Sequence, residues 1–280
     1  MGEFYTVKEV VELYINGCKN KVSQSNAKIF GKAMLAGAMI GFGAAASNVA
    51  AHMITNVGLA RLVAGLVFPV GLMMVILLGA ELFTGDCLMA MSVPAGSQKN
   101  LDVIRVLVVV YLGNILGAVI LTGLIVMSGQ LDYSGGILGA YTIKVALGKV
   151  NLSASKAISS GILCNILVCA AVLMAMASKD ITGKLLASFF TIMLFVTSGF
   201  EHCVANMYYL TAGLFAKENA GYVARALEQY GITAEQLDSL NMGNVIVSNM
   251  IPVTIGNILG GIIFLGLPLY YLNNHKNKNA

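Results

Sequence analysis

The sequence predicts an all-α polytopic membrane protein whose six transmembrane helices form a 3+3 inverted repeat. The chain has 280 residues, of which 58% are hydrophobic and only 11% are charged, whereas about 25% of the residues in a soluble domain are charged. Several uncharged stretches reach the roughly 20 residues that a helix needs to cross the apolar part of a bilayer. The pentapeptide Gly-Asn-Ile-Leu-Gly occurs at both Gly113–Gly117 and Gly256–Gly260, which indicates two related halves.

Six apolar segments account for the predicted spans. They are Ala33–Ala51, Leu62–Ala80, Val106–Leu131, Ala157–Ser178, Leu185–Ala216 and Ser239–Asn274. The second and the fifth each carry the pattern Gly-x-Glu, at Gly79–Glu81 and Gly199–Glu201. Glycine and charge interrupt a membrane helix only where the freed backbone groups face protein or a wet cavity. We therefore predict that the second and fifth helices are broken and line a pathway.

Aligning the two halves of the sequence divides the chain into five segments. Because each half has an odd number of spans, the second half enters the membrane from the opposite face, and such inverted repeats place substrate sites near the midplane. The expected segments are an N-terminal interfacial helix (1–28), the first repeat (29–131), an outer-face connector (132–156) with a short helix around Ile143, the second repeat (157–272) with an extramembrane insertion (217–241), and a cytoplasmic tail (273–280). Thr233 and Gln236 predict a capping box that starts a small helix in the insertion.

The charge of the loops orients the chain. Of the 17 Lys and Arg residues, eleven lie on the side of the two termini and six on the opposite side. Positive loops are retained in the cytoplasm, so both termini are expected there, in the inner or plasma membrane of a prokaryote. The N-terminal segment lacks the apolar core of a signal peptide, and no basic block indicates nucleic-acid binding.

The residues before the first span predict a short surface helix. Val7, Val11, Tyr14 and Cys18 fall on one helical stripe, and charged residues occupy the rest of the circumference. Amphipathic helices of this kind lie in the plane of the membrane surface. An interfacial anchor and a regulatory plug both fit the pattern.

Three ionisable side chains fall within the broken spans, namely Glu81, Glu201 and His202. Such a group costs about 2.5 to 3.5 kcal/mol at the centre of a membrane helix on insertion scales, and it usually marks a functional site. His202 is either a proton or hydrogen-bond donor to a passing anion, since imidazole changes charge near pH ~6.5, or a neutral buried side chain bonded to a carbonyl. We interpret Glu81 and Glu201, which hold equivalent places, as acceptors for the free N–H groups at the breaks.

Two amides lie within reach of this group. Asn206 follows His202 by four residues and therefore shares its helix face, and Asn165 is the only amide in the fourth span. Either could orient His202 or Glu201, and helix packing is the alternative for Asn165.

Further candidates surround the breaks. Thr84 offers its hydroxyl to an anion or closes its own turn. Lys149, shortly before the fourth span, raises the local anion concentration at a pore mouth or is simply solvated. Apolar residues in or beside the broken spans either pack or close the pore against water, and these are Phe68, Leu72, Leu82 and Phe195.

Other classes of function find little support. The five cysteines form no Cys-x-x-Cys pair and are interpreted as small apolar fillers. A membrane enzyme would need several ligands at one depth, but the histidines are only His52, His202 and His275. We therefore expect neither catalysis nor a metal or cofactor. A neutral-solute channel is disfavoured because the chain has no Asn-Pro-Ala repeats.

Four motifs together carry a resemblance to a known family. They are Ala80-Glu81-Leu82-Phe83-Thr84, Ser198-Gly199-Phe200-Glu201-His202, Ala205-Asn206-Met207 and Ile251-Pro252-Val253-Thr254-Ile255-Gly256-Asn257. On these motifs the chain closely resembles the formate/nitrite transporter family, and the resemblance extends from the first span to the last.

The resemblance implies an aquaporin-like protomer that assembles as a homopentamer with one pore per subunit and passes small monovalent weak-acid anions. It implies that Thr84 and His202 flank a central chamber and that Lys149 attracts anions. The implied constrictions are Phe68, Leu72, Leu82 and Phe195, and the implied supporting network is Glu81, Asn165, Glu201 and Asn206.

The mechanism and the substrate stay open at this stage. A bare anion crosses apolar rings at high cost, so it either passes partly hydrated, as in a channel, or receives a proton from His202, as in proton-coupled symport. Formate, nitrite and hydrosulfide are all compact monovalent anions, and no residue separates them.

Overall fold

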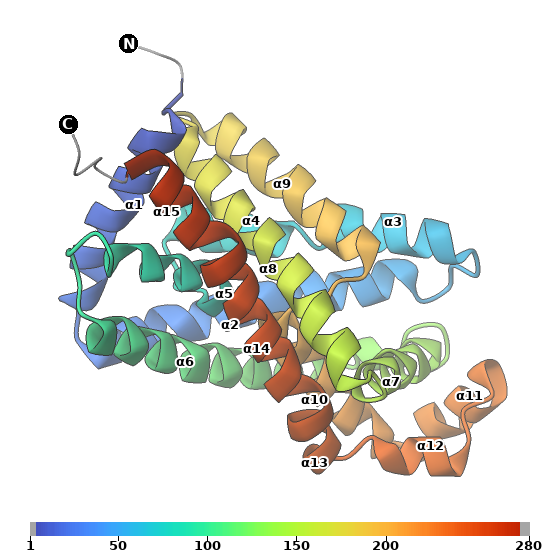
Figure 1. Ribbon diagram of the computed structural model, residues 1–280. Coiled ribbons are helices and arrows are strands. Elements are labelled where there is room, and N and C mark those ends of the chain that lie inside the picture. The colour runs from blue at the N-terminus through green and yellow to red at the C-terminus, as the bar shows by residue number, and fades with distance from the viewer. Residues whose placement is uncertain (1–3, 275–280) are drawn as a thin grey trace, which may run out of the picture.

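Helices account for nearly all of the chain in the computed structural model, which describes residues 4–274 (Figure 1). Within this range six helical stretches are long and apolar enough to cross a membrane, which confirms the predicted all-α class. They are Asn26–Ala51, Val57–Leu78, Asn100–Met127, Ala154–Ala177, Ile181–Ser198 and Met242–Asn273.

The first half of the chain supplies three of these spans. Its elements are α1 (Val7–Val22), α2 (Asn26–Ala51), α3 (Val57–Val67), α4 (Val70–Leu78), α5 (Phe83–Asp86), the 3₁₀ segment η1 (Cys87–Ser92) and α6 (Asn100–Met127). The second span consists of α3 and α4 and ends at Gly79, which adopts a left-handed φ of 65°. A short extended stretch then leads into α5, so the predicted break in the second helix is confirmed.

The second half repeats this plan. Its elements are the 3₁₀ segment η2 (Gln130–Asp132), α7 (Ile137–Val150), α8 (Ala154–Ala177), α9 (Ile181–Ser198), α10 (Cys203–Lys217), α11 (Ala220–Tyr230), α12 (Ala234–Ser239), α13 (Met242–Asn244), the π-helical η3 (Val245–Met250), α14 (Ile251–Leu259), the π-helical η4 (Gly260–Gly266) and α15 (Leu267–Asn274). Gly199 ends α9 with a φ of 74°, and α10 follows after the second predicted break.

The repeated pentapeptide packs the third span of each half against the first. A Cβ atom added to Gly117 of α6 would lie only 1.9 Å from the carbonyl oxygen of Met34 in α2. In the second half, a Cβ on Gly260 would lie 2.3 Å from the carbonyl oxygen of Ile162 in α8. Only glycine permits such close approach of two backbones, which is a common device in membrane helix packing. The sequence repeat is therefore a repeat of packing.

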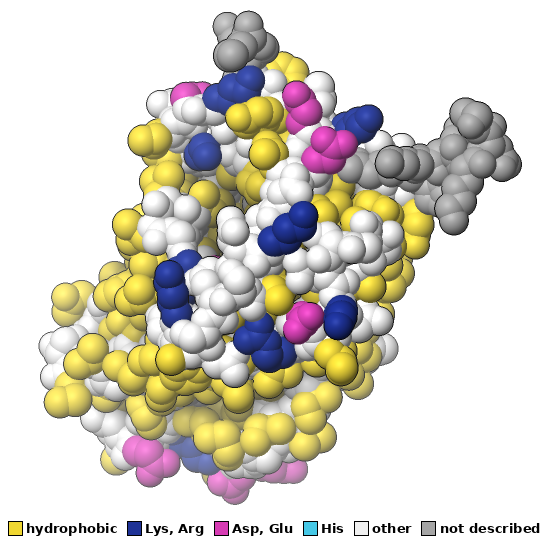
Figure 2. Space-filling model, turned by 90° about the vertical axis from the view of Figure 1, so that its left-hand side faces the viewer, with side chains coloured by type: hydrophobic (Ala, Val, Ile, Leu, Met, Phe, Trp, Pro, Cys, Tyr) yellow, Lys and Arg dark blue, Asp and Glu magenta, His cyan; other side chains and the backbone are white. Residues whose placement is uncertain are grey.

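Helix α1 docks on the body of the protein. Its N-cap Thr6 forms a capping box, and three residues of the predicted stripe, Val11, Tyr14 and Cys18, are buried, whereas Val7 is 52% exposed. The helix packs on η1, α8 and α15, so α1 and α15 lie at one end of the molecule (Figure 1). We call this end the α1 face. Lys and Arg side chains are scattered over it, next to a largely hydrophobic flank (Figure 2).

Helix α7 corrects the predicted connector. We expected a loop with a short helix around Ile143, but the helix runs over 14 residues. Its Leu138, Ile143 and Leu147 are buried in a second apolar cluster together with residues of α10 and α11. Because these apolar contacts stabilise the helix, the glycines of the segment do not break it. We call the end of the molecule that holds α7, α11 and α12 the α7 face (Figure 1).

The insertion after α10 holds two helices instead of the single one expected. Helix α11 begins at Asn219, whose side chain accepts the N–H groups of Gly221 and Tyr222. Helix α12 begins with the predicted capping box of Thr233 and Gln236, which is confirmed. Most of the predicted tail, including His275, lies outside the described residues.

Candidate functional site

The two helix breaks are held by one amide each, and both amides come from the repeated pentapeptide. Asn114 Oδ1 accepts the N–H of Phe83 at 3.0 Å, and Asn114 Nδ2 donates to the carbonyl oxygens of Ala33 and Glu81. Broken helices leave backbone groups unpaired, and each must find a partner inside a membrane. A single buried amide therefore satisfies both sides of the first break.

Asn257 does the same at the second break. Its Oδ1 accepts the N–H of Cys203 at 2.9 Å, and its Nδ2 donates to the carbonyl oxygens of Gly161 and Glu201. The match with Asn114 extends to the choice of partners, since each amide bonds the first residue of the new helix, the Glu of the break and the first span of its half. Sequence reasoning missed this role, although the repeated pentapeptide was the signal for it.

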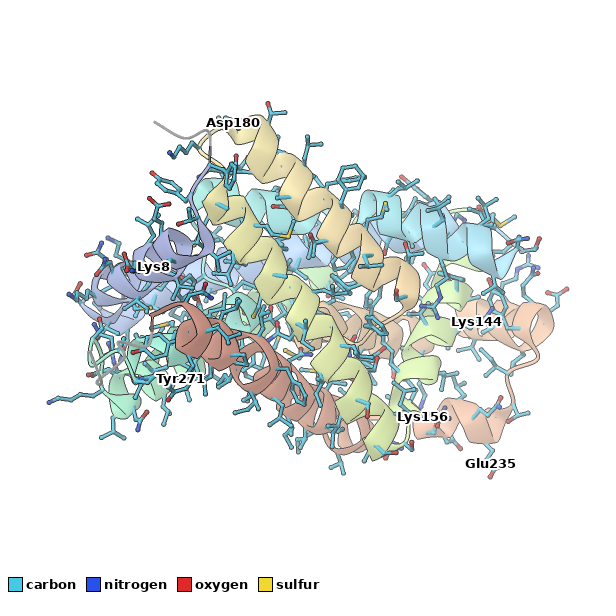
Figure 3. All side chains as sticks on the ribbon, turned by 45° about the horizontal axis from the view of Figure 1, so that its top comes forward. Lys8, Lys144, Lys156, Asp180, Glu235 and Tyr271 are labelled. Carbon is cyan, nitrogen blue, oxygen red and sulfur yellow. The ribbon has the colours of Figure 1, made fainter. Side chains whose placement is uncertain are left out.

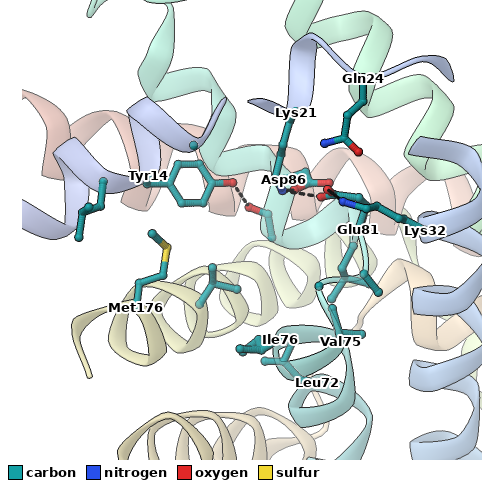
Figure 4. A pocket seen from close by; sticks show the side chains of 17 residues that line it. Tyr14, Lys21, Gln24, Lys32, Leu72, Val75, Ile76, Glu81, Asp86 and Met176 are labelled. Atoms are coloured by element: carbon teal, nitrogen blue, oxygen red, sulfur yellow. Dashed lines mark hydrogen bonds and ion pairs between the residues drawn. The ribbon is translucent and has the colours of Figure 1, made fainter. Parts of the chain in front are cut away.

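Glu81 and Glu201 do not accept backbone N–H groups, so our interpretation of them is wrong. The carboxylate of Glu81 forms ion pairs with Lys21 at 2.6 Å and Lys32 at 3.6 Å. Lys21 also pairs with Asp86 (Figure 4). Because Asn114 already satisfies the backbone at this break, the carboxylate is free to bind the lysines. Burial lowers the pKa of Lys21, but Asp86 and Glu81 outweigh burial, and the pKa is raised.

Glu201 lies at the centre of a buried polar network on the other side. Its carboxylate accepts from Lys149 Nζ at 2.9 Å, from Asn206 Nδ2 at 2.7 Å and from Asn249 Nδ2 at 3.3 Å. Asn249 belongs to the π-helical η3 and also receives a hydrogen bond from Asn206. The Asn206 side chain thus bonds Glu201, and only the Asn206 backbone N–H bonds His202, at its carbonyl oxygen. No motif or spacing in the sequence analysis had pointed to Asn249.

Lys149 is more enclosed than the sequence suggested. It lies in the last turn of α7, its side chain is only 15% exposed, and the Glu201 carboxylate neutralises it. Its ammonium also lies 5.0 Å from the centre of the Tyr209 ring. Lys149 therefore lies on a helix and not on a loop of the predicted connector, because α7 packs against α10.

Thr84 and His202 meet between the two breaks. The Thr84 hydroxyl lies 2.8 Å from His202 Nε2, and the two residues are 0% and 2% exposed. His202 is the N-cap of α10, and its Nδ1 accepts the N–H of Ala205 at 3.0 Å. A nitrogen that accepts a hydrogen bond carries no proton, so the geometry assigns the neutral tautomer with hydrogen on Nε2. His202 therefore donates to the Thr84 hydroxyl.

The four apolar side chains that the resemblance implies as constrictions are buried. Phe68 and Phe195 pack edge to face with ring centres 5.6 Å apart, and Phe195 lies 5.8 Å from the His202 ring. Towards the α1 face, Leu72 and Leu82 are buried and line the end of a cavity of about 370 Å³. Thus all four candidates are buried, and the pair Phe68 and Phe195 packs next to His202.

The cavity on the α1 face connects α1 with the first break. Tyr14, Lys21, Glu81 and Asp86 line it, and the Tyr14 hydroxyl donates to the Gly85 carbonyl at 3.0 Å (Figure 4). Lys32 lines it as well, so two lysines and two carboxylates face this cavity. Sequence analysis did not identify Lys21, because nothing in the spacing places it next to Glu81.

Asn165 holds the backbone of the first break. Its Nδ2 donates to the carbonyl oxygens of Thr84 at 3.2 Å and Asn257 at 2.6 Å. Cys169 Sγ donates to the same Thr84 oxygen. Among the described residues the Asn165 amide forms no hydrogen bond with His202 or Glu201, and it acts on Thr84 through the main chain.

Comparisons with known proteins agree on one relationship. A family profile described as "Formate/nitrite transporter" matches residues 8–271. The chain is 40% identical over 215 residues to "Formate channel FocA" of Haemophilus influenzae, covering 77% of this chain and 75% of that protein. It is 36% identical over 262 residues to the "Probable formate transporter" of Methanothermobacter thermautotrophicus, covering 87% and 88%.

Solved structures match over most of the fold. A structure described as "Pentameric formate channel with formate bound" has a TM-score of 0.78 and 33% identity, and the match covers 88% of this chain and 97% of that one. A structure described as "FNT family ion channel" has a TM-score of 0.78 at 27% identity, covering 94% and 98%.

Proposed function

Because this chain belongs to the formate/nitrite transporter family, we propose that it is a membrane channel for small monovalent weak-acid anions, with formate as its leading substrate. The family is one of transporters and channels, not of enzymes. Formate is favoured because the relatives and the matching solved structure are formate proteins by name. Nitrite and hydrosulfide are the competing anions.

The single observation that carries the mechanism is the hydrogen bonding of His202. Its Nδ1 caps α10 and its Nε2–H points to the Thr84 hydroxyl. An imidazolium would carry hydrogen on Nδ1 and lose the cap at Ala205. The geometry therefore supports a neutral donor that offers a hydrogen bond to the anion, and it disfavours the alternative of proton-coupled symport in which His202 gives up a proton.

The four apolar side chains set the remaining barrier. Leu72 and Leu82, and likewise Phe68 and Phe195, leave no polar partner for an anion that is stripped of water. We infer that these side chains move to admit a partly hydrated anion, and that Thr84 and His202 replace some of its lost hydrogen bonds. The pair would then serve as the one polar stop between two gates.

The assembly and orientation are part of the same proposal. A homopentamer with one pore per subunit is supported by the likeness to a solved formate channel that is described as pentameric. The excess of Lys and Arg on the α1 face supports a cytoplasmic position for both termini in a prokaryotic inner or plasma membrane. The proposed partners are thus the lipid bilayer, the small anion and four further copies of the chain.

Flux into proteoliposomes tests the proposal. Formate, nitrite and hydrosulfide would be compared side by side in the unmodified protein, His202→Gln and His202→Leu. Glutamine keeps an N–H donor but cannot be protonated, so we expect its formate flux to stay within roughly tenfold of the unmodified protein. Leucine offers no donor, and we expect a loss of up to about 100-fold, because hydrogen bonds to charged groups contribute about 1.5 to 3 kcal/mol.

The symport alternative makes a different prediction. If His202 delivers protons, the Gln variant loses flux as completely as the Leu variant. Formate entry then acidifies the vesicle lumen with the unmodified protein but not with either variant. Equal flux in all three proteins would contradict any role of His202 in permeation. A size-exclusion profile like that of the unmodified protein controls for folding of each variant.

A further inference from the structure

Arg61 lies directly against the second helix break, on the α7 face. It is in the second turn of α3. A Cβ atom added to Gly199 would lie 2.2 Å from Arg61 Nη1 and 2.9 Å from Arg61 Cζ. The guanidinium therefore covers the bare backbone of Gly199, three residues before His202. Glycine at this position both ends α9 and makes room for the arginine.

The donors of Arg61 are not used by the protein. Across residues 4–274 no hydrogen bond or ion pair engages its guanidinium, and the residue is exposed. The two other arginines differ, since Arg105 donates to Asn26 Oδ1 and the Val22 carbonyl, and Arg225 pairs with Glu228. Arg61 thus presents five N–H donors to whatever approaches the break from the α7 face.

The surroundings of Arg61 are basic and aromatic. Its charge acts on the hydroxyl groups of Tyr141 and Tyr209, and Tyr209 carries the Lys149 ammonium on its ring. Lys144 lies 4.3 Å above the ring of Tyr230. Figure 3 shows Lys144 at the end of the molecule where α3, α7 and α11 come together.

We call the entrance of the proposed channel on the α7 face the α7 mouth. Lys149 cannot supply the α7 mouth with a free cation, because Glu201 pairs with it at 2.9 Å. Glu201 in turn is buried and bonded to two amides, so it does not reach Arg61's exposed donors. Within residues 4–274 the Arg61 guanidinium therefore stays exposed and unpaired, whereas Lys149 is neutralised. Cations at such a mouth raise the local anion concentration.

We propose that Arg61 is an anion-binding residue at the α7 mouth that favours planar anions with two oxygens, such as formate and nitrite, over hydrosulfide. The inference rests on the proposed function and refines its substrate class. A guanidinium binds two oxygens of one anion through two parallel N–H bonds, whereas lysine acts as a point charge. Hydrosulfide has one acceptor atom and gains nothing from the fork.

Two substitutions separate the fork from the charge. Arg61→Lys keeps the charge and removes the fork, and Arg61→Gln removes both. Initial rates into proteoliposomes would be measured for the three anions at concentrations well below saturation. For Arg61→Lys we expect formate and nitrite rates to fall about fivefold and the hydrosulfide rate to change less than about twofold, because a bidentate pair exceeds a single contact by about 1 kcal/mol.

Arg61→Gln should lower all three rates at low salt, and the loss should shrink in high salt because salt screens an exposed charge. Arg225→Lys is the matched control, since Arg225 is an exposed arginine on the same face that already has a carboxylate partner. It should leave every rate unchanged.

An unchanged ratio of formate to hydrosulfide flux in Arg61→Lys would overturn the inference. If the ratio stays constant because all three fluxes fall together, the contact of Arg61 with Gly199 is purely structural. Either result leaves the proposed channel intact, because the unmodified protein still conducts. If the unmodified protein conducts none of the three anions, the proposed function fails and this inference fails with it.

Discussion

The two helix breaks are copies of one design that differ at a few positions, and these differences coincide with the candidate pore chemistry. Each break has a glycine in the left-handed region, a Glu two residues later and an Asn from the repeated pentapeptide that satisfies the backbone. Each Glu pairs with a lysine near the end of a helix that does not span the membrane, Lys21 of α1 or Lys149 of α7.

Residues at equivalent sequence positions after the two glutamates then differ in type. One position after Glu, the first half has Leu82 and the second has His202, and three positions after it the first has Thr84 and the second Val204. The imidazole and the hydroxyl therefore come from opposite halves and meet face to face. Symmetry builds the two breaks, and asymmetry places the two members of one polar pair on different breaks.

The fifth position after Glu also differs. The second half has Asn206, whose amide donates to Glu201, whereas the first half has Asp86, whose carboxylate competes with Glu81 for Lys21. Burial of two carboxylates beside one ammonium is less favourable than a satisfied amide network. The first break has a further cation, Lys32, at 3.6 Å, and its Glu81 and Asp86 line a cavity.

Replacing each glutamate in turn should give the largest difference in stability between the two breaks. Glu201→Leu leaves Lys149 without its carboxylate in a buried place, and we expect a loss of about 3 to 5 kcal/mol of stability. Glu81→Leu should be milder, because Asp86 still pairs with Lys21. Thermal unfolding of the detergent-purified proteins measures the difference, and a larger loss for Glu81→Leu would contradict the comparison.

Replacing the capping amides should show that the breaks are alike. Asn114→Leu and Asn257→Leu each strand one buried backbone N–H, and each should lose about 1 to 3 kcal/mol. Equal shifts of the unfolding midpoint are expected. Asn165→Leu is a useful control, since that amide donates only to carbonyl oxygens and should have a smaller effect. Tolerance of one capping variant and collapse of the other would break the proposed equivalence.

Exchanging residues at the third position should give the smallest effect on stability. Thr84→Val, which copies the second half, removes the acceptor of His202 Nε2–H and should cost about 0.5 to 1.5 kcal/mol. Val204→Thr, which copies the first half, adds a hydroxyl that can bond the preceding turn of α10 and should be nearly neutral. Formate flux read alongside unfolding should fall only in the Thr84 variant. If formate flux fell in both variants, the hydroxyl of Thr84 would have no special role at this position.

Several features of the fold and site were predictable from the residues themselves. Long uncharged runs dictate membrane helices, because a bilayer core tolerates no unpaired backbone. Gly79 and Gly199 beside acidic residues indicated the breaks, and the motifs around Thr84 and His202 identified these two residues before their contact was known. The repeated pentapeptide predicted an internal symmetry, although not the capping role of its asparagines.

Long-range pairing was decided only by the tertiary structure. Lys21 reaches Glu81 and Asp86 across 60 and 65 positions of sequence, and Lys149 reaches Glu201 because α7 folds inward on its apolar face. Arg61 meets Gly199 because α3 and α9 pack side by side. Local composition specifies which segments become helix and where they break, but the partner of a buried charge depends on which helices come together, and that is a property of the packed molecule.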